Sequence, residues 1–112
     1  MKKVYISGKY TAPDDAGILE NVKASLQYGH SVAAWGAHPV IPHVACPQAS
    51  TWDEAMAVCK VMLANCDWIL MTEGWTQSRG AMQELCWAHE SGQRMFFSLE
   101  ELSSALAEEA RA

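Results

Sequence analysis

An alternation of strand-like and helix-like segments constrains the fold of this chain more than any other feature. Short apolar runs at residues 4–7, 68–72 and 94–97, and a proline-containing run at 38–43, are each followed by a segment with helical spacing of its apolar residues. Such alternation implies a parallel sheet with helices on both faces and right-handed crossovers. A chain of 112 residues suits one domain, expected to span residues 1–112. We therefore predict an α/β sandwich of three layers, with about four parallel strands in the order 2-1-3-4.

The first half of the chain predicts one long helix and an edge strand. Apolar residues recur at helical spacing from about residue 15 to 35. Gly36 follows, and glycine readily adopts the left-handed conformation that ends helices. Gly29 lies inside this helix at a cost of about 1 kcal/mol relative to Ala, which close packing on the sheet would explain. A competing interpretation breaks the helix at Gly29. Pro39 and Pro42 bracket the next strand and favour a sheet edge, and residues 44–49 read as a loop.

Capping patterns mark two of the three remaining helices. A Ser or Thr followed three residues later by an acidic residue satisfies backbone N–H groups at a helix start. Such pairs are Ser50 with Asp53, Thr51 with Glu54, and Ser98 with Glu101. The expected helices span residues 52–65, 80–91 and about 99–110, the second ending at Gly92.

The predicted topology places a binding site beside residues 68–84. In parallel sheets ligands bind beyond the carboxyl ends of the strands, where the strand order reverses. For the order 2-1-3-4 this point lies between the first and third strands, so the loops at residues 7–10 and 73–79 meet there. A helix begins at Ser78, Arg79 and Gly80, and its free N–H groups favour anions. Glu84 follows about one turn later, within reach of a bound phosphate or sugar.

Each candidate residue also has a purely structural interpretation. Glu84 is either a nucleophile or general acid, or a surface glutamate near a helix start. Ser78 and Gly80 either bind phosphate or form an ordinary helix cap. Lys9 and Arg79 are the cations expected near the mouth, where they either neutralise an acidic ligand or lie in solvent. The aromatic candidates are Tyr5, which also suits the core, Tyr10, and Trp75, which either stacks on a base or sugar or anchors a dimer.

Charge and composition exclude several classes of function. The net charge is −5, the pI is about 5.2 and no basic run occurs, which disfavours binding to a nucleic-acid polymer. No run reaches the roughly 18 apolar residues of a membrane helix, and we expect no signal peptide. Four scattered cysteines without a Cys-x-x-Cys pair indicate reduced thiols in a cytoplasmic protein. His38, His43 and Cys46 fit no strong zinc pattern, so we expect no metal and no cofactor.

Several short motifs resemble one superfamily. They are the Tyr5-Ile6-Ser7-Gly8 start, the Pro42-His43 strand end, Cys66-Asp67 before a strand, and Gly74-Trp75-x-x-Ser78-x-Gly80-x-x-x-Glu84. Together they resemble the nucleoside 2-deoxyribosyltransferase superfamily, over nearly the whole chain to about residue 97. The most similar branch is that of the small deoxyribosyltransferase-like domains of unknown function, related to 2′-deoxynucleoside 5′-monophosphate N-hydrolases.

The resemblance implies a Rossmann-like (flavodoxin-like) fold and N-glycosidic chemistry on 2′-deoxynucleosides or their 5′-monophosphates. Glu84 matches the glutamate that attacks C1′ and forms a covalent deoxyribosyl-enzyme, and Tyr5 matches the tyrosine that orients it. Ser78 matches a serine that holds the 5′-phosphate, and His43 falls where the hydrolases carry a histidine. Homodimers or larger homo-oligomers are also implied. The expected substrate-binding residues are Ser7, Gly8, Lys9, Tyr10, His43, Trp75, Ser78, Arg79 and Gly80.

One departure from the superfamily pattern concerns the departing base. Active members carry an aspartate eight residues before the position of Asp67, where this chain has Cys59. A thiol does not replace a carboxylate that handles the proton of the base, unless another acid such as Glu73 does so. Three hypotheses follow: an N-glycosidic enzyme, a non-catalytic nucleotide- or nucleotide-sugar-binding module, or an interaction protein. The last would show a collapsed mouth and an apolar patch around Trp52, Trp75 and Trp87.

Overall fold

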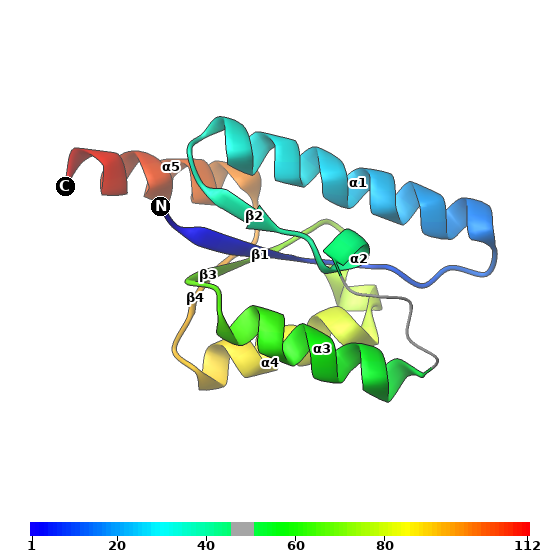
Figure 1. Ribbon diagram of the computed structural model, residues 1–112. Coiled ribbons are helices and arrows are strands. Elements are labelled where there is room, and N and C mark those ends of the chain that lie inside the picture. Colours follow the sequence, from blue (N-terminus) through cyan, green and yellow to red (C-terminus); the bar gives the residue numbers. More distant parts are fainter. Residues whose placement is uncertain (46–50) are drawn as a thin grey trace.

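The computed structural model describes residues 1–45 and 51–112, and these form a parallel α/β fold around one sheet (Figure 1). The strands are β1 (Lys3–Ser7), β2 (His38–Val40), β3 (Trp68–Met71) and β4 (Arg94–Phe96). They are all parallel and lie in the order β2-β1-β3-β4, which confirms the predicted order. The order reverses between β1 and β3, so a crevice is expected beyond the carboxyl ends of these two strands.

Helices cover both faces of the sheet, as predicted. Helices α1 (Asp15–Ala34) and α5 (Leu99–Arg111) lie on one face, and α3 (Trp52–Ala64) and α4 (Arg79–Glu90) lie on the other (Figure 1). Each face buries its own apolar cluster. None of the helices in the described part of the chain has the length and hydropathy needed to span a bilayer.

Strand β1 divides its side chains between these two faces. Val4 and Ile6 belong to the cluster under α1 and α5, whereas Tyr5 belongs to the cluster under α3 and α4. This division follows from the two-residue repeat of a strand, in which alternate side chains point to opposite faces. Tyr5 and Ser7 therefore point toward α4, the helix that carries Glu84.

Helix α1 is continuous, so the interpretation that broke it at Gly29 is wrong. Gly29 is buried, and a Cβ added there would lie 2.5 Å from Cδ1 of Ile41. Close packing of the helix therefore explains this glycine. The Asp14 side chain accepts a hydrogen bond from the N–H of Gly17 at the start of α1, and Gly36 follows its end with φ of 83°.

The chain after β2 differs from the prediction. The strand stops at Val40, and a short helix α2 (Pro42–Ala45) replaces the end of the predicted strand and the start of the predicted loop. The N–H groups of Val44 and Ala45 donate to the carbonyl of Ile41 at 3.1 and 3.0 Å. Proline at the first helical position needs no hydrogen-bond partner for its nitrogen, which favours a helix here. Residues 46–49 of the predicted loop, Cys46 among them, and Ser50 lie outside the described residues.

The predicted helix starts agree with the structure. Thr51 caps α3 by accepting from the N–H of Glu54, and Ser98 caps α5 by accepting from the N–H of Glu101, both at 3.1 Å. Between β3 and α4 the chain forms a short 3-10 helix, η1 (Trp75–Gln77). Helix α4 then begins at Arg79, one residue earlier than predicted, with Ser78 as its cap.

Candidate active site

A buried carboxylate lies where β1 meets α4. The hydroxyl of Tyr5 donates to Oε2 of Glu84, and the hydroxyl of Ser7 donates to Oε1 at 2.7 Å. Tyr5 and Ser7 are fully buried, and Glu84 is 5% exposed. The two donors come from alternate positions of one strand, and each oxygen of the carboxylate receives one of them. The site thus holds the carboxylate in a fixed orientation.

The surroundings of Glu84 act on its pKa in opposite directions. Burial raises the pKa, because a carboxylate loses its hydration in the interior. Hydrogen bonds from Tyr5, Ser7 and Cys59 lower it, but burial prevails and the pKa stays above its usual value. Burial, followed by the charge of Glu84, raises the pKa of Tyr5 far above its usual range. Tyr5 therefore keeps its proton and remains a donor to Glu84.

A cavity of about 580 Å³ opens beside this carboxylate. This volume lies within the range of about 300–1,000 Å³ that small-molecule sites occupy. Its walls come from the loop after β1 and from α2, α3 and α4, so the cavity lies at the predicted reversal of strand order. The mouth is not collapsed, contrary to the expectation for an interaction protein. The lining residues are Gly8, Tyr10, Thr11, Pro42, His43, Val44, Trp52, Ala55, Met56, Cys59, Ser78, Arg79, Gly80, Ala81 and Glu84.

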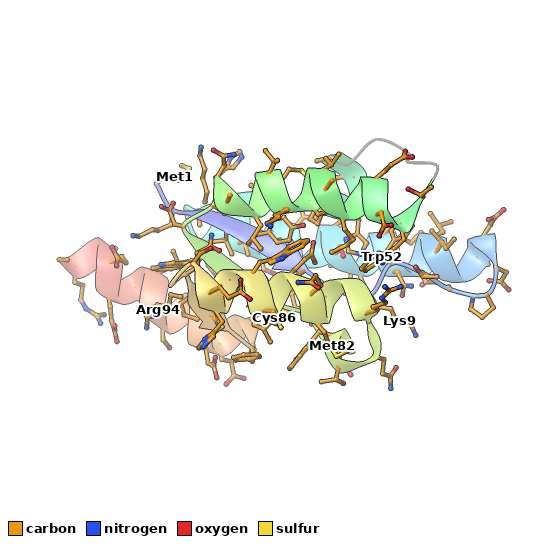
Figure 2. All side chains as sticks on the ribbon, turned by 90° about the horizontal axis from the view of Figure 1, so that it is seen from below. Met1, Lys9, Trp52, Met82, Cys86 and Arg94 are labelled. Atoms are coloured by element: carbon orange, nitrogen blue, oxygen red, sulfur yellow. The ribbon has the colours of Figure 1, made fainter. Side chains whose placement is uncertain are left out.

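The start of α4 forms the positive side of the cavity. Ser78 caps the helix by accepting from the N–H of Ala81 at 3.1 Å. The guanidinium of Arg79 lies 3.8 Å from the centre of the Trp52 ring, a cation–π contact. In Figure 2, Trp52 and Lys9 lie at the same end of the α3–α4 pair. The combination of a helix N-terminus and a guanidinium suits a phosphate group.

His43 and Tyr10 line the cavity together. Their ring centres lie 5.4 Å apart, and Nε2 of His43 lies 3.0 Å from the carbonyl oxygen of Lys9. A carbonyl only accepts, so Nε2 carries the proton and Nδ1 is left as an acceptor. Nδ1 is buried and has no partner among the described residues. Burial lowers the pKa of His43, so its imidazole is neutral near pH 7.

Gly8 lines the same cavity for a steric reason. It is buried beside Thr72, and an added Cβ would lie 2.0 Å from Oγ1 of that threonine. The chain therefore passes close to Thr72, directly after β3, as it leaves β1.

Not every predicted residue lies at the cavity. Tyr5 and Ser7 lie behind Glu84 and do not line it, and Lys9 is exposed and offers only its backbone carbonyl to His43. Trp75, predicted to stack on a ligand, instead lines a second hollow of about 410 Å³ together with Glu73. Its ring lies 5.7 Å from that of Phe97, because η1 directs the tryptophan toward the start of α5. Glu73 is therefore not placed to serve the cavity as an acid.

Trp52 and Met56, on the first turns of α3, line the cavity but were not among the predicted binding residues. Cys59, which the resemblance aligned with an active-site aspartate, follows one turn later within hydrogen-bonding reach of Glu84 and Tyr5. The position of Trp52 in the first turn of a predicted helix beside the crevice could have indicated that it lines the cavity. Among the described residues no group of three His, Cys, Asp or Glu side chains gathers as metal ligands do.

Fold and site together define a Rossmann-like α/β domain with a buried, hydrogen-bonded carboxylate at the reversal of strand order. The family described as a domain of unknown function, DUF4406, matches residues 2–97, and the chain belongs to this family. No protein of curated function matches the chain. A solved structure of a 2-desoxiribosyltransferase from Leishmania mexicana is similar, with a TM-score of 0.56 and 20% identity. The similarity covers 85% of this chain and 62% of the Leishmania chain, and it supports the deoxyribosyltransferase-like fold.

Proposed function

We propose that this protein cleaves or transfers the N-glycosidic bond of 2′-deoxynucleosides or their 5′-monophosphates, with Glu84 as the nucleophile. The observation that carries the proposal is the Glu84 carboxylate, buried and held by Tyr5 and Ser7 beside a cavity of about 580 Å³. A carboxylate held in this way has one orientation toward a bound sugar, and positioning of this kind contributes much of enzymatic catalysis.

In the proposed reaction the Glu84 carboxylate attacks C1′ as the base departs with the electrons of the C1′–N bond. The product of this step is a deoxyribosyl ester of Glu84. Water or a second base then attacks C1′ and frees the carboxylate. Tyr5 and Ser7 favour the ionised form of Glu84 against the effect of burial, which a nucleophile requires. Ser78, Arg79 and Gly80, at the start of α4, hold the 5′-phosphate when one is present.

Two further points support this proposal. The similar Leishmania structure is of a 2-desoxiribosyltransferase, which is consistent with nucleoside chemistry on this fold. The cavity also contains the ring of Tyr10 and the indole of Trp52, which can pack against a base.

A non-catalytic nucleotide-binding module is the second candidate function. The observation that favours it is Cys59, a thiol at the cavity wall where the resemblance leads one to expect an aspartate. In this case the cavity would bind a nucleotide through the start of α4 and release no base. Ligand binding would then raise the melting temperature by mass action.

The deciding experiment is the intact mass of the protein after incubation with 2′-deoxynucleosides and their 5′-monophosphates, with free base assayed in the same samples. The enzymatic function predicts release of a base or a deoxyribosyl adduct. The Glu84→Gln variant should lose both, whereas Glu90→Gln, an exposed position on the same helix, should retain them. Base release that persists in Glu84→Gln would refute Glu84 as the nucleophile. A thermal shift with no base and no adduct would favour the binding module.

We also propose a cytoplasmic homodimer or larger homo-oligomer. Large apolar side chains are exposed on the α3–α4 side of the molecule, with Val58, Val61 and Met82 exposed by 36%, 63% and 43%. Light scattering after size-exclusion chromatography would measure the mass, and a monomer at micromolar concentration would contradict this part of the proposal.

A further inference from the structure

Among the described residues the cavity has a single carboxylate, and this restricts the leaving group of the proposed reaction. Among its described lining residues Glu84 is the one acidic side chain, and the other titratable groups belong to Tyr10, His43, Cys59 and Arg79. Residues 46–50, Cys-Pro-Gln-Ala-Ser, contain no Asp, Glu or His. Glycoside cleavage commonly uses a pair of carboxyl groups, of which one attacks and the other protonates the leaving group. The second member of the pair is missing from the described lining.

The remaining groups are poor proton donors to a departing base. His43 is neutral, and its single proton is on Nε2, which faces the carbonyl of Lys9. Cys59 lines the cavity, but its thiol also interacts with Glu84 and Tyr5. Thiols and phenols are in any case much weaker acids than carboxylic acids, by about four and six pKa units in reference compounds. Arg79 keeps its proton at any relevant pH.

We infer that the preferred substrates are N-glycosides whose base carries a permanent positive charge, such as N7-alkylated purine deoxynucleotides. This inference rests on the function proposed above and names its substrate class. As Glu84 bonds to C1′, the C1′–N bond breaks and its electron pair neutralises the cationic base. The base therefore leaves as a neutral molecule and needs no proton. A neutral base would leave as an anion unless an acid protonated it.

The distribution of charge in the cavity fits such a ligand. Glu84 lies five residues after Arg79 on α4, about 7.5 Å further along the helix axis. The cation at the start of the helix suits a phosphate, and the buried carboxylate suits a positive charge close to C1′.

The same arrangement has a consequence for the second step. Water attacks C1′, the bond from C1′ to the Glu84 oxygen breaks, and the proton of the water passes to solvent. No second carboxylate among the described lining residues is available to accept that proton. The glycosyl ester should therefore persist, so that base is released in a burst followed by a slower steady rate.

The first test compares two substrates that differ in one methyl group and one charge. N7-methyl-2′-deoxyguanosine 5′-monophosphate and 2′-deoxyguanosine 5′-monophosphate are incubated with the protein at pH 6.5, and base release is followed by chromatography. Spontaneous loss from the methylated compound is subtracted with the Glu84→Gln variant. General acid catalysis contributes about 10²–10⁴-fold, so kcat/KM should be at least about 100-fold higher for the cationic compound. A kcat/KM for the neutral compound within tenfold of that for the cationic compound would overturn the inference while supporting the proposed function.

A second test restores the missing acid. Cys59→Asp should raise cleavage of the neutral compound and so lower the ratio of the two kcat/KM values. Cys59→Asn is the matched control, because it has the shape of Asp without its acidity, and it should leave the ratio high. A ratio that falls equally in both variants would overturn the inference, with melting curves confirming that both fold. If neither compound is cleaved and no adduct forms in the wild-type protein, both the inference and the proposed function fail.

Discussion

Replacing Tyr5 by Phe tests how a hydrogen bond offsets the effect of burial on the pKa of Glu84. The substitution removes one hydroxyl and leaves the ring, which is fully buried against α3 and α4. The hydroxyl donates to Oε2 of Glu84 and lowers the pKa of that carboxyl. Its loss should therefore raise the pKa of Glu84 further above the usual value.

The size of this change follows from the hydrogen bond itself. A hydrogen bond to a charged group contributes about 1.5–3 kcal/mol, and one between neutral groups about 0.5–1.5 kcal/mol. The difference, about 1–1.5 kcal/mol, is the preference of the Tyr5 hydroxyl for the ionised carboxyl. Since one pKa unit corresponds to 1.36 kcal/mol, the pKa of Glu84 should rise by about one unit.

Carbon-13 NMR of glutamate side-chain carboxyls measures this pKa directly and requires no substrate. The Glu84 signal is assigned by its disappearance in Glu84→Gln. Tyr28→Phe is the control, because the Tyr28 hydroxyl on α1 accepts from the N–H of Glu73 at 3.2 Å and has no contact with Glu84. A Glu84 pKa that stays constant or falls in Tyr5→Phe would refute this account of the site.

Three further substitutions test packing and charge. Gly8→Ala should reduce the free energy of unfolding by about 1–3 kcal/mol, because its Cβ would lie 2.0 Å from Thr72 Oγ1; urea denaturation with an unchanged midpoint would contradict this. Gly29→Ala should change stability by less than about 1 kcal/mol, since the helix gains about as much as the displaced end of Ile41 loses; a larger loss in the same assay would show that Ile41 does not yield. Glu84→Gln should gain stability relative to wild type as pH rises above 4.5, because the raised pKa makes the native state hold a proton that the unfolded state has released. Denaturation of both proteins at pH 4, 6 and 8 measures this difference in stability. A variant that becomes less stable than wild type as pH rises would contradict the prediction.

The sequence predicts the sheet well because its signals are local. Apolar runs and capping pairs such as Ser98 with Glu101 act within a few residues, and the strand order then follows from short right-handed connections. The position of Glu84 near the start of a helix at the strand reversal was predictable for the same reason. Its burial was not, because it depends on α3 packing beside α4, a contact between distant segments.

The differences between the sequence-based expectations and the structure also have local physical causes. The direction of Trp75 depends on the 3-10 turn that follows Gly74, whose φ of 87° turns the chain toward α5. The periodicity of apolar residues contains no information about such a turn. The short helix at Pro42 was likewise missed, because four residues are too few to show a helical repeat.

The two donors to Glu84 also limit which insertions and deletions this protein can tolerate. Tyr5 and Ser7 lie on a strand whose register is fixed on one side by β2 and on the other by β3, with Ser7 opposite Met71. A shift of this register by one residue would turn both hydroxyls to the opposite face, away from the carboxylate. Relatives of this sequence can therefore vary in length at many loops, but a change that shifts the register of β1 removes both donors at once.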